Sequence, residues 1–518
     1  MFRRLADGLV AAVSAGSWRD SRVCLTLGFL AVFRLILAYA LPLTGDESYF
    51  VQWGDHPAGG YYDHPPMVGW WLSGLLAISR AEVFIRVPAI VLPLLLAWAA
   101  WVLARPHGIE KARWAALLVL WQPVNVWNVL ITTDTPVILF SMLSILAYVL
   151  ALRADAPGVR LAGQALAGGL LGLAFLGKYF AALLGFAYLA HLFFVRRDAG
   201  RWAGFALLLL AALPAPLYNL WWNSGQCWVN ILFNFLNRNQ AAGFEWHNPV
   251  LYLLSVLYLA TPWVVWVLWR ERAVLARRAA EHPEVTTLLW LAGLPLAIFA
   301  LMSFWRAVGL HWLVSFIPLM AVLAALVLGS AVLGRMLAAS IVFGIMHGVF
   351  FLAVLVMPMQ AWTGTRVAEG VAMRVLGPQI VGRLQPGSAL LATESYSSAS
   401  FLAYASGRPV AVFGDGSFYA RQDDFITDWR AQDGRDVLIF RSRPGKAEDY
   451  LPFFRRVDFS EMEIAGVRFY RIHGQGFDYG VYHDKVLKRV RDRYYRIPAW
   501  LPLRSCLFTE RYFPESVR

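Results

Sequence analysis

An acidic stretch, TGDESYFVQWGDHPAGGYYDHPPMVGWWL (residues 44–72), directly follows an apolar segment. Asp46 and Glu47 stand at its start without a spacer, and a carboxylate held there can take a proton from an acceptor hydroxyl. The structural alternative, a solvated loop carboxylate, is the usual explanation of a lone acid. It is weaker here, because several polar groups share the stretch.

Asp63 and His64 form a second group, followed at once by Pro65 and Pro66. Two prolines restrict the backbone and prevent a helix from starting before them. The arrangement therefore predicts a rigidly held Asp63–His64 pair. A simple turn before a helix explains the same residues, and both interpretations stay open.

Asp134 is a third candidate, in the segment ITTDTPVILF between two apolar runs. Asp or Thr before Pro136 begins a helix well, so a helix-capping role is the structural alternative. A helix start also attracts anions. An acid near a phosphate leaving group suits a metal ion or a sugar hydroxyl.

Four further residues carry or can carry positive charge near predicted membrane boundaries: Lys178, Arg238, Arg306 and His311. A cation in lipid costs several kcal/mol unless it meets an anion or extends to the surface. Together, such side chains suit a lipid-linked phosphate. Snorkelling explains each taken singly, and a lone histidine is often structural. Arg34, inside the first apolar segment, predicts a partner that the sequence does not identify.

The elements that position these residues are membrane spans. Of the 518 residues, 59% are hydrophobic and 15% are charged, and the mean hydropathy is +0.53. A soluble protein carries roughly 25% charged residues. The net charge of +13 fits basic residues at the cytoplasmic ends of spans, which excludes a nucleic-acid partner as its explanation.

Apolar runs predict eleven spans, at 23–43, 86–104, 114–130, 135–153, 160–177, 179–195, 202–221, 250–269, 285–305, 310–329 and 336–358. Basic residues occur on every second connection: Arg3, Arg4, Arg19 and Arg22, then Arg105, Lys111 and Arg113, Arg153 and Arg160, Arg196, Arg197 and Arg201, Arg270, Arg272, Arg277 and Arg278, and Arg335. This alternation places the amino terminus inside. The connections with the acids and with Lys178, and everything after about residue 359, then face outward.

The amino-terminal segment resembles a cleavable signal, with Arg3 and Arg4 before a run ending in Ala38-Tyr39-Ala40. Arg34 interrupts the run and many spans follow, so an uncleaved first span is expected. The cysteines, Cys24, Cys227 and Cys506, have no metal-ligand spacing. A Cys227–Cys506 bridge is possible in an oxidising compartment, but the expectation is that none forms.

The chain divides into a membrane domain at 1–360 and a small α/β domain at 375–475. The outer loop 44–85 includes an interfacial helix at 65–78, apolar but too short to span. SALLATES, RPVAVFGD, DVLIF and GVRFYRI read as strands around a helical SSASFLAYAS. The basic segment 476–518 is expected to lie as a tail on lipid headgroups.

Four motifs together resemble the GT-C glycosyltransferases: GDESYFVQWG, YYDHPPMVGWW, ITTDTP and GLAFLGKYFA, in this order between Gly45 and Ala181. The nearest branch comprises protein O-mannosyltransferases, lipid A aminoarabinose transferases and rhizobial galacturonosyl transferases. One difference is His64, where the aminoarabinose branch tends to carry lysine. After roughly the first 200 residues the resemblance is mainly architectural.

The resemblance implies a mostly α, polytopic GT-C fold of about 11–13 spans with a small α/β periplasmic domain. It implies a polyprenyl-phosphate sugar donor, Asp46 as leading catalytic base and Glu47 beside it. Asp63, His64 and Asp134 would then contact donor or acceptor, and Lys178 the lipid phosphate. Arg238, Arg306 and His311 complete the expected substrate-binding set.

The expected activity is therefore that of a multi-pass glycosyltransferase of the bacterial inner membrane, with its active site facing the periplasm. A base on the opposite face from the leaving phosphate predicts a single displacement with inversion. Lipid A, a surface glycan or a protein is the acceptor, and membrane lipids surround the enzyme. No cofactor is certain, and a divalent cation chelated by Asp46, Asp63 and Asp134 is an open alternative. No nucleotide-binding or zinc-protease motif occurs.

Two other classes fit a polytopic chain. A transporter or flippase of lipid-linked sugars has many spans and buried charges, but typically shows paired repeats and broken central spans. A structural membrane subunit carries its acids only as loop charges. The gathering of polar groups on one face, with an outer domain following, favours surface chemistry.

Overall fold

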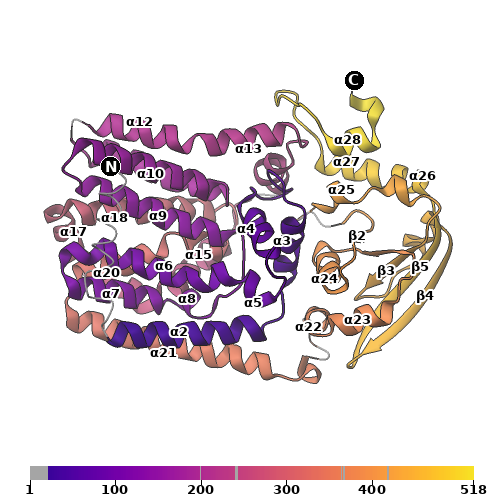
Figure 1. The fold of residues 1–518 in the computed structure, drawn as a ribbon, viewed down its shortest axis with the longest axis horizontal. Helices are drawn as coiled ribbons and strands as arrows, with labels where there is room; N and C mark the ends of the chain where they lie inside the picture. The colour runs from indigo at the N-terminus through magenta and orange to yellow at the C-terminus, as the bar shows by residue number, and fades with distance from the viewer. Residues whose placement is uncertain are drawn as a thin grey trace. The chain divides into compact units, whose positions relative to one another are not determined.

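The computed structural model describes residues 21–198, 200–239, 243–362, 365, 368–416, 419 and 421–517. The predicted inward-facing residues Arg3, Arg4 and Arg19 lie outside the described residues, as does the start of the signal-like segment. The chain forms two compact units. The helical unit contains 21–40, 83–218 and 243–355, and the α/β unit contains 41–82, 219–239 and 356–517 (Figure 1).

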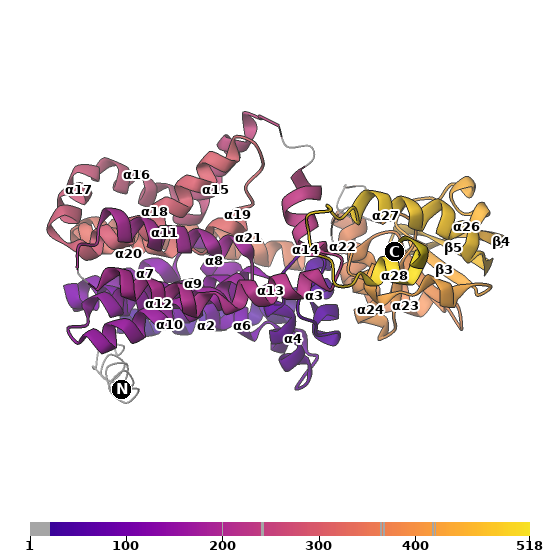
Figure 2. The same ribbon diagram turned by 90° about the horizontal axis from the view of Figure 1, so that it is seen from above.

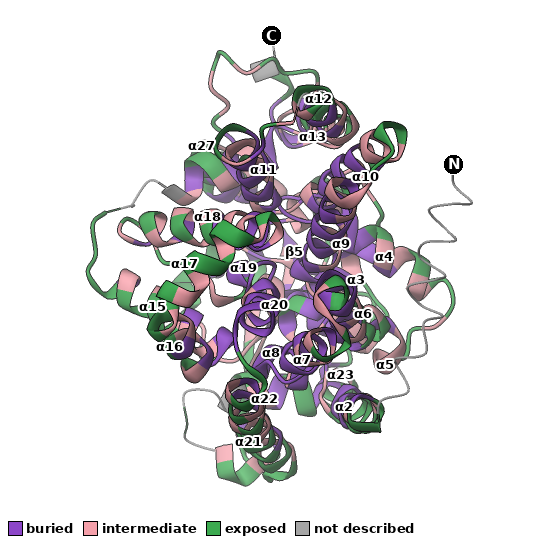
Figure 3. Ribbon diagram, turned by 90° about the vertical axis from the view of Figure 1, so that its left-hand side faces the viewer, coloured by how far each residue is buried: buried purple, intermediate pink, exposed green. Residues whose placement is uncertain are grey.

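The helical unit is built from helices that are mostly long and apolar and lie side by side, with a few short ones among them (Figure 2). They are α2 (Ser21–Ala40), α6 (Val87–Ala104), α7 (Ile109–Leu120), α8 (Pro123–Trp127), α9 (Asp134–Arg153), α10 (Pro157–Phe175), α11 (Ala182–Phe194), α12 (Arg201–Ala212), α15 (His247–Ala260), α16 (Pro262–Arg270), α17 (Arg272–Glu281), α18 (Pro283–Ser303), α19 (Leu310–Leu313), α20 (Ile317–Val327) and α21 (Ser330–Val356). In sequence, α5 (Glu82–Ile85) and α13 (Pro214–Ser224) cross from one unit to the other. Seen end-on, α9 and α20 are largely buried, while α2 and α21 expose one side (Figure 3).

The chain is a multi-pass membrane protein. Among the described residues, seven helices are long and apolar enough to span a bilayer, and the pair α15 and α16, bent by 96°, makes up to eight. The predicted spans at 179–195 and 310–329 fall on shorter apolar helices, Tyr179–Phe194 and Ile317–Val327. The expected mostly helical fold is confirmed.

The helical unit has two chemically different ends. At one end, Lys178 contacts Asp134, the first residue of α9. At the other, Arg153, the last residue of α9, pairs with Glu284 at the start of α18, and Lys111 donates to the carbonyl of Leu328. These contacts agree with the alternation expected from the basic residues. We call the two ends the Asp134 end and the Arg153 end.

Arg34 has a partner that the sequence concealed. Its guanidinium is 2% exposed and donates hydrogen bonds of 2.6 Å to the carbonyl oxygens of Ala89, Asn125 and Asn128. Pro93, inside α6, has no N–H to give the carbonyl of Ala89 four residues earlier. The other two carbonyls lie at the end of the short helix α8, where backbone acceptors lack helical partners. The buried cation therefore replaces missing backbone donors.

The α/β unit contains one five-stranded sheet of order β2-β1-β3-β5-β4. Its strands are β1 (Leu390–Thr393), β2 (Val410–Val412), β3 (Val437–Arg441), β4 (Phe454–Ile464) and β5 (Val467–Phe477). β1 is parallel to β2 and β3, whereas β5 is antiparallel to β3 and β4, with Ile439 opposite Ile472. The helices are α3 (Gly45–Asp55), α4 (Met67–Leu76), α14 (Val229–Ile231), α22 (Ala368–Val375), α23 (Gly377–Leu384), α24 (Tyr396–Ser406), α25 (Asp423–Ile426), α26 (Tyr479–Tyr482), α27 (Lys488–Tyr494) and α28 (Leu507–Tyr512), and the 3-10 segment η4 (Asn237–Asn239) follows α14.

Apolar residues pack on both faces of this sheet, because side chains alternate along each strand. Leu391 and Phe440 pack with residues of α23 and α24 on one face. Ala392 and Ile439 pack with residues of 482–513 on the other. The segment 476–518, expected as a separate tail, thus contributes through its described residues to the core of the α/β unit.

The expectation that Cys227 and Cys506 stay unpaired is wrong. The two residues form a disulfide, with Cα atoms 4.3 Å apart, and both are buried. A tight turn with positive φ at Cys227 and Trp228 brings the segments together, and the Cys227 N–H donates to the carbonyl of Ser505. Cys24 is exposed and takes no part in this disulfide. A separation of 279 residues in sequence gave no local sign of the pairing.

Candidate active site

The start of α3 fixes the two leading acids in different environments. Thr44 caps the helix: its hydroxyl accepts from the Glu47 N–H at 3.2 Å, and Glu47 Oε2 accepts from the Thr44 N–H at 3.0 Å. This reciprocal capping box encloses Glu47, which is 0% exposed, whereas Asp46 is exposed. Of the two acids, Asp46 is therefore the one that can meet a substrate.

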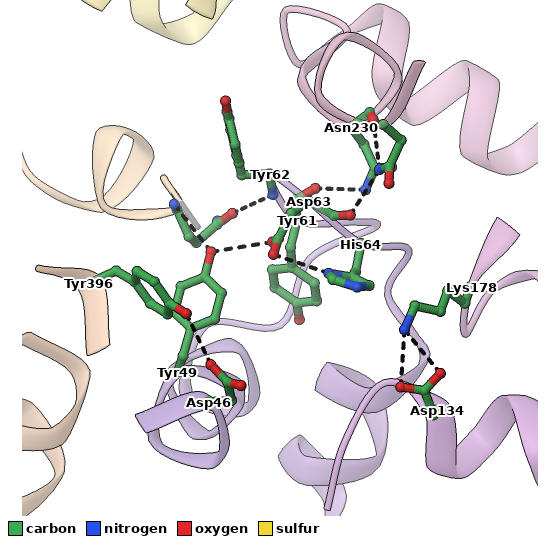
Figure 4. A network of polar contacts seen from close by, with 12 residues as sticks. Asp46, Tyr49, Tyr61, Tyr62, Asp63, His64, Asp134, Lys178, Asn230 and Tyr396 are labelled. Carbon is green, nitrogen blue, oxygen red and sulfur yellow. Dashed lines mark hydrogen bonds and ion pairs between the residues drawn. The ribbon is translucent and has the colours of Figure 1, made fainter. Parts of the chain in front are cut away.

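A residue from a distant part of the chain orients Asp46. The Tyr396 hydroxyl, at the start of α24, donates to Asp46 Oδ1 at 3.0 Å (Figure 4). The helix starts approach closely, since a Cβ at Gly45 would lie 1.8 Å from Ser397 Oγ. Glycine at position 45 is thus what permits this contact.

Asp63 forms the second acidic position of the same unit. Its Oδ1 accepts from the Tyr49 hydroxyl at 3.4 Å, and its Oδ2 lies 3.1 Å from His64 Nδ1. The histidine contact is a close ion-pair distance and not an aligned hydrogen bond. The Asp63–His64 pair predicted from the two prolines is thus in contact.

Three side-chain amides clamp the backbone that carries Asp63. Asn230 donates to the carbonyl of Tyr61 at 3.0 Å and Asn234 to that of Asp63 at 2.9 Å. Gln422 Oε1 accepts from the Tyr62 N–H at 2.9 Å (Figure 4). The loop 61–63 is therefore fixed by polar contacts from two other segments of the α/β unit.

Two phenols near these carboxylates stay protonated. Burial, and then the charge of Asp63, raise the pKa of Tyr49 well above its ordinary value. Burial, and then the charge of Asp46, raise the pKa of Tyr396. Each phenol therefore remains a hydrogen-bond donor to its carboxylate at physiological pH.

The helical unit holds its own polar pair at the Asp134 end. Lys178 Nζ donates to Asp134 Oδ1 at 2.9 Å and Oδ2 at 3.0 Å, and both side chains are largely buried. His311 Nε2 lies 4.0 Å from Asp134 Oδ2. The carboxylate satisfies the buried cation, which a lone lysine near lipid requires.

The structure divides the predicted residues between the units. Asp46, Glu47, Asp63, His64 and Arg238 belong to the α/β unit, and Asp134, Lys178, Arg306 and His311 to the helical unit. Arg238 lies in η4 with its guanidinium 6.0 Å from the Phe233 ring, and Arg306 follows α18 at the Asp134 end.

Sequence reasoning missed five residues of the α/β unit: Tyr49, Asn230, Asn234, Tyr396 and Gln422. The spacing of Asn230 and Asn234, one helical turn apart, was an available signal. No local sequence signal identified Tyr396 or Gln422, because their partners Asp46 and Tyr62 lie 350 and 360 positions away in the chain.

The carboxylates offered as metal ligands have other partners. Asp46 and Asp63 accept hydrogen bonds from phenols, and Asp134 pairs with Lys178. Within the described part of the chain, no group of three or more His, Cys, Asp or Glu side chains is placed to hold a metal ion.

Comparisons with known proteins give matches both by sequence and by overall fold. Residues 63–222 match the family model described as dolichyl-phosphate-mannose-protein mannosyltransferase. The chain is 29% identical over 318 residues to an undecaprenyl phosphate-alpha-4-amino-4-deoxy-L-arabinose arabinosyl transferase of Sodalis glossinidius, covering 53% of this chain and 54% of the relative. It is 31% identical over 215 residues to the lipid A galacturonosyltransferase RgtD of Rhizobium johnstonii, covering 39% and 43%.

The chain thus spans about half the length of the curated relatives it matches. Among solved structures, ArnT from Cupriavidus metallidurans superposes with a TM-score of 0.63 at 16% identity, covering 87% of this chain and 97% of ArnT. ArnT bound to undecaprenyl phosphate matches with the same score, covering 88% and 98%. These findings confirm the ArnT-like GT-C fold and the resemblance to the GT-C glycosyltransferases.

Proposed function

We propose that this protein transfers a sugar from a polyprenyl-phosphate donor to a hydroxyl group of lipid A, a surface glycan or a protein. Two relatives support the donor and acceptor classes: one is named for an undecaprenyl-phosphate aminoarabinose and the other for lipid A. The fold is shared with a structure that binds undecaprenyl phosphate.

In the proposed reaction, Asp46 removes the proton of the acceptor hydroxyl while the acceptor oxygen attacks the anomeric carbon of the donor sugar. The bond from that carbon to the phosphate oxygen breaks, and polyprenyl phosphate leaves. Lys178 stabilises the departing phosphate, with Arg306, Arg238 and His311 as further binding groups. Asp63 and His64 hold sugar hydroxyls. Attack opposite to the leaving group inverts the anomeric configuration.

One observation carries this proposal: Asp46 is exposed, yet its position is fixed. The capping box fixes the helix start, and Tyr396 holds one carboxylate oxygen. A solvated loop carboxylate would need neither contact. A base prepared in this way contributes roughly 10²–10⁴-fold to the rate.

We place the reaction at the periplasmic face of the bacterial inner membrane. The basic residues gather toward the Arg153 end, as expected of a cytoplasmic side. The Cys227–Cys506 disulfide supports an oxidising compartment for the α/β unit.

Protein cations, rather than a divalent metal ion, supply the positive charge in this proposal. Transfer is therefore expected to persist in EDTA. Loss of activity in EDTA that Mg²⁺ or Mn²⁺ restores would assign Asp46, Asp63 or Asp134 a metal-binding role instead.

The test is transfer from a labelled polyprenyl-phosphate sugar by the purified protein. We expect Asp46→Asn to abolish transfer while membrane insertion is normal. Asp55→Asn, at the other end of α3, is the matched control, since Asp55 pairs with Arg80 at the surface. Full transfer by Asp46→Asn would remove Asp46 as base. Mass spectrometry of envelope lipids and glycans from a deletion strain would identify the sugar.

One observation favours the second candidate, a transporter of lipid-linked sugars. The pair α15 and α16 bends by 96° around Thr261, and broken spans are typical of transporters. Movement of a lipid-linked sugar across proteoliposomes without an acceptor, unaffected by Asp46→Asn, would establish that alternative.

A further inference from the structure

A cavity of about 400 Å³ lies within the α/β unit, apart from the carboxylates already described. The loop after α3, the turn after α13, α25 and α28 line it. Its volume is within the range of small-ligand sites, which is roughly 300–1,000 Å³. The proposed transfer does not involve this cavity.

The lining combines aromatic rings with groups that can form hydrogen bonds. Trp222 and Phe425 supply rings, and Gln226, Gln422 and His56 supply amide and imidazole groups. The lining residues that the structure describes include no Asp, Glu, Lys or Arg. A phosphate would require cations, and an alkyl chain would leave the amides unused. A sugar ring has an apolar C–H face for an aromatic ring and hydroxyls for amides, so this lining suits a neutral saccharide.

The groups that would contact the sugar are fixed in advance. The Trp222 ring packs on the backbone of Gly60, where a Cβ would lie 2.6 Å from the ring. Gln422 Oε1 is held by the Tyr62 N–H. That contact orients the rest of the amide, with its two N–H donors, in the lining. Binding groups held in place lose little entropy when a ligand arrives.

The disulfide braces two sides of the cavity. Cys227 follows Gln226, and Cys506 precedes Leu507, which also lines the cavity. The Gln226 backbone is fixed in the same turn, with its N–H donating to Asn223 and its carbonyl accepting from Val229. The lining therefore depends on a cross-link between segments far apart in sequence.

Gln422 connects the cavity to Asp63. Its side chain contacts Tyr62, and its backbone N–H donates to the Tyr49 hydroxyl at 3.4 Å. Tyr49 in turn donates to Asp63. We propose that the cavity is an acceptor subsite that binds a neutral sugar ring of the glycan to be modified. This inference rests on the proposed transferase function.

The direct test is saturation-transfer NMR of the full chain in lipid nanodiscs with cellobiose and N,N′-diacetylchitobiose as neutral probes. Glucose 1-phosphate serves as the anionic probe. We expect the neutral disaccharides to bind, with affinity reduced ~10-fold by Trp222→Ala and about fivefold by Gln226→Ala, the losses expected for one aromatic face and one neutral hydrogen bond. Trp221→Ala is the matched control, because Trp221 is 56% exposed and packs under Arg504.

Undecaprenyl phosphate binding, measured on the same samples, is expected to be unchanged in both cavity variants. Three results would overturn the inference. They are no binding of the neutral sugars, binding by Trp222→Ala and Gln226→Ala that is as tight as that of the wild type, and a preference for the phosphorylated sugar. The outcome is separable from the proposed function. If donor transfer is intact and sugar binding fails, only the subsite is wrong, whereas sugar binding without any transfer activity contradicts the transferase.

Discussion

Tyr396 donates a 3.0 Å hydrogen bond to Asp46 from a helix that begins 350 positions later in the chain. The two residues stand at the starts of α24 and α3, and Gly45 allows those starts to approach. The contact orients one carboxylate oxygen of Asp46 and leaves the residue exposed. Tyr396 is thus a positioning residue for the proposed base.

Removal of only the Tyr396 hydroxyl tests this role. We expect Tyr396→Phe to lower kcat roughly 10- to 100-fold with little change in KM, because one hydrogen bond to a charged group is lost. Tyr404→Phe, which removes a hydroxyl of the same helix that donates to the Arg80 carbonyl, is the control. A rise in KM alone would assign Tyr396 to substrate binding.

Glu47 is expected to act through structure and not through chemistry. Its Oε2 completes the capping box, and glutamine keeps an acceptor oxygen at that position. We therefore expect Glu47→Gln to retain most transfer activity, while Glu47→Ala lowers the free energy of unfolding by about 0.5–2 kcal/mol. Loss of transfer in a fully folded Glu47→Gln protein would return Glu47 to the catalytic role that the sequence suggested.

Local signals in the sequence were sufficient for much of this arrangement. The helix start at Asp134, the helix at 65–78 and four of the five strands follow from apolar spacing, prolines and turn residues. β4 was missed because its side chains are mostly exposed, which weakens the alternating pattern. The alternation of basic residues gave the two ends of the helical unit, since charge placement depends on the membrane and not on tertiary contacts.

Contacts between distant segments could not be inferred in this way. The Cys227–Cys506 bridge, the Gln422 clamp on Tyr62 and the Tyr396 contact each join segments that sequence analysis assigned to separate domains. Arg34 shows the same limit: its acceptors are backbone carbonyls exposed by Pro93 and by the end of α8, and carbonyls have no signature in the sequence.

The Asp134–Lys178 pair provides a test of phosphate binding. Lys178→Met leaves Asp134 buried without its cation, so this variant is expected to lose stability and to bind undecaprenyl phosphate more than 10-fold more weakly. The double variant Asp134→Asn/Lys178→Met should recover stability and not binding. Recovery of both, measured by thermal unfolding and by native mass spectrometry, would show that Lys178 has a structural role only.

The Cys227–Cys506 disulfide is expected to stabilise the folded protein. Cys227→Ser/Cys506→Ser should lower the free energy of unfolding by about 2–5 kcal/mol. Cys24→Ser, at an exposed cysteine outside the disulfide, is the control and should leave the free energy of unfolding nearly unchanged. Maleimide labelling before and after reduction reports the bond in the native membrane. Two reactive cysteines in the unreduced, denatured wild-type protein besides Cys24 would contradict the oxidised pair and its oxidising compartment.

Asp423 gives the α/β unit a specific dependence on pH. Burial raises the pKa of its carboxyl from 3.8 to about 7, although the Val412 N–H and the Thr427 hydroxyl donate to it. Between these values the folded state keeps a proton that the unfolded state has released. The free energy of unfolding therefore falls as pH rises from about 4 to about 7 and is level above that, with a total change of at most a few kcal/mol.

Asp423→Asn should remove this decline and be more stable than the wild type at pH 8, since Thr427 can rotate to accept from the new amide. Asp428→Asn is the control of opposite sign. Its hydrogen bond from Arg430 lowers the carboxyl pKa, so its contribution is lost only as pH falls below about 4. The measurement is thermal unfolding of the three proteins between pH 3 and pH 8. If the loss of stability with rising pH persists in Asp423→Asn, another group causes it.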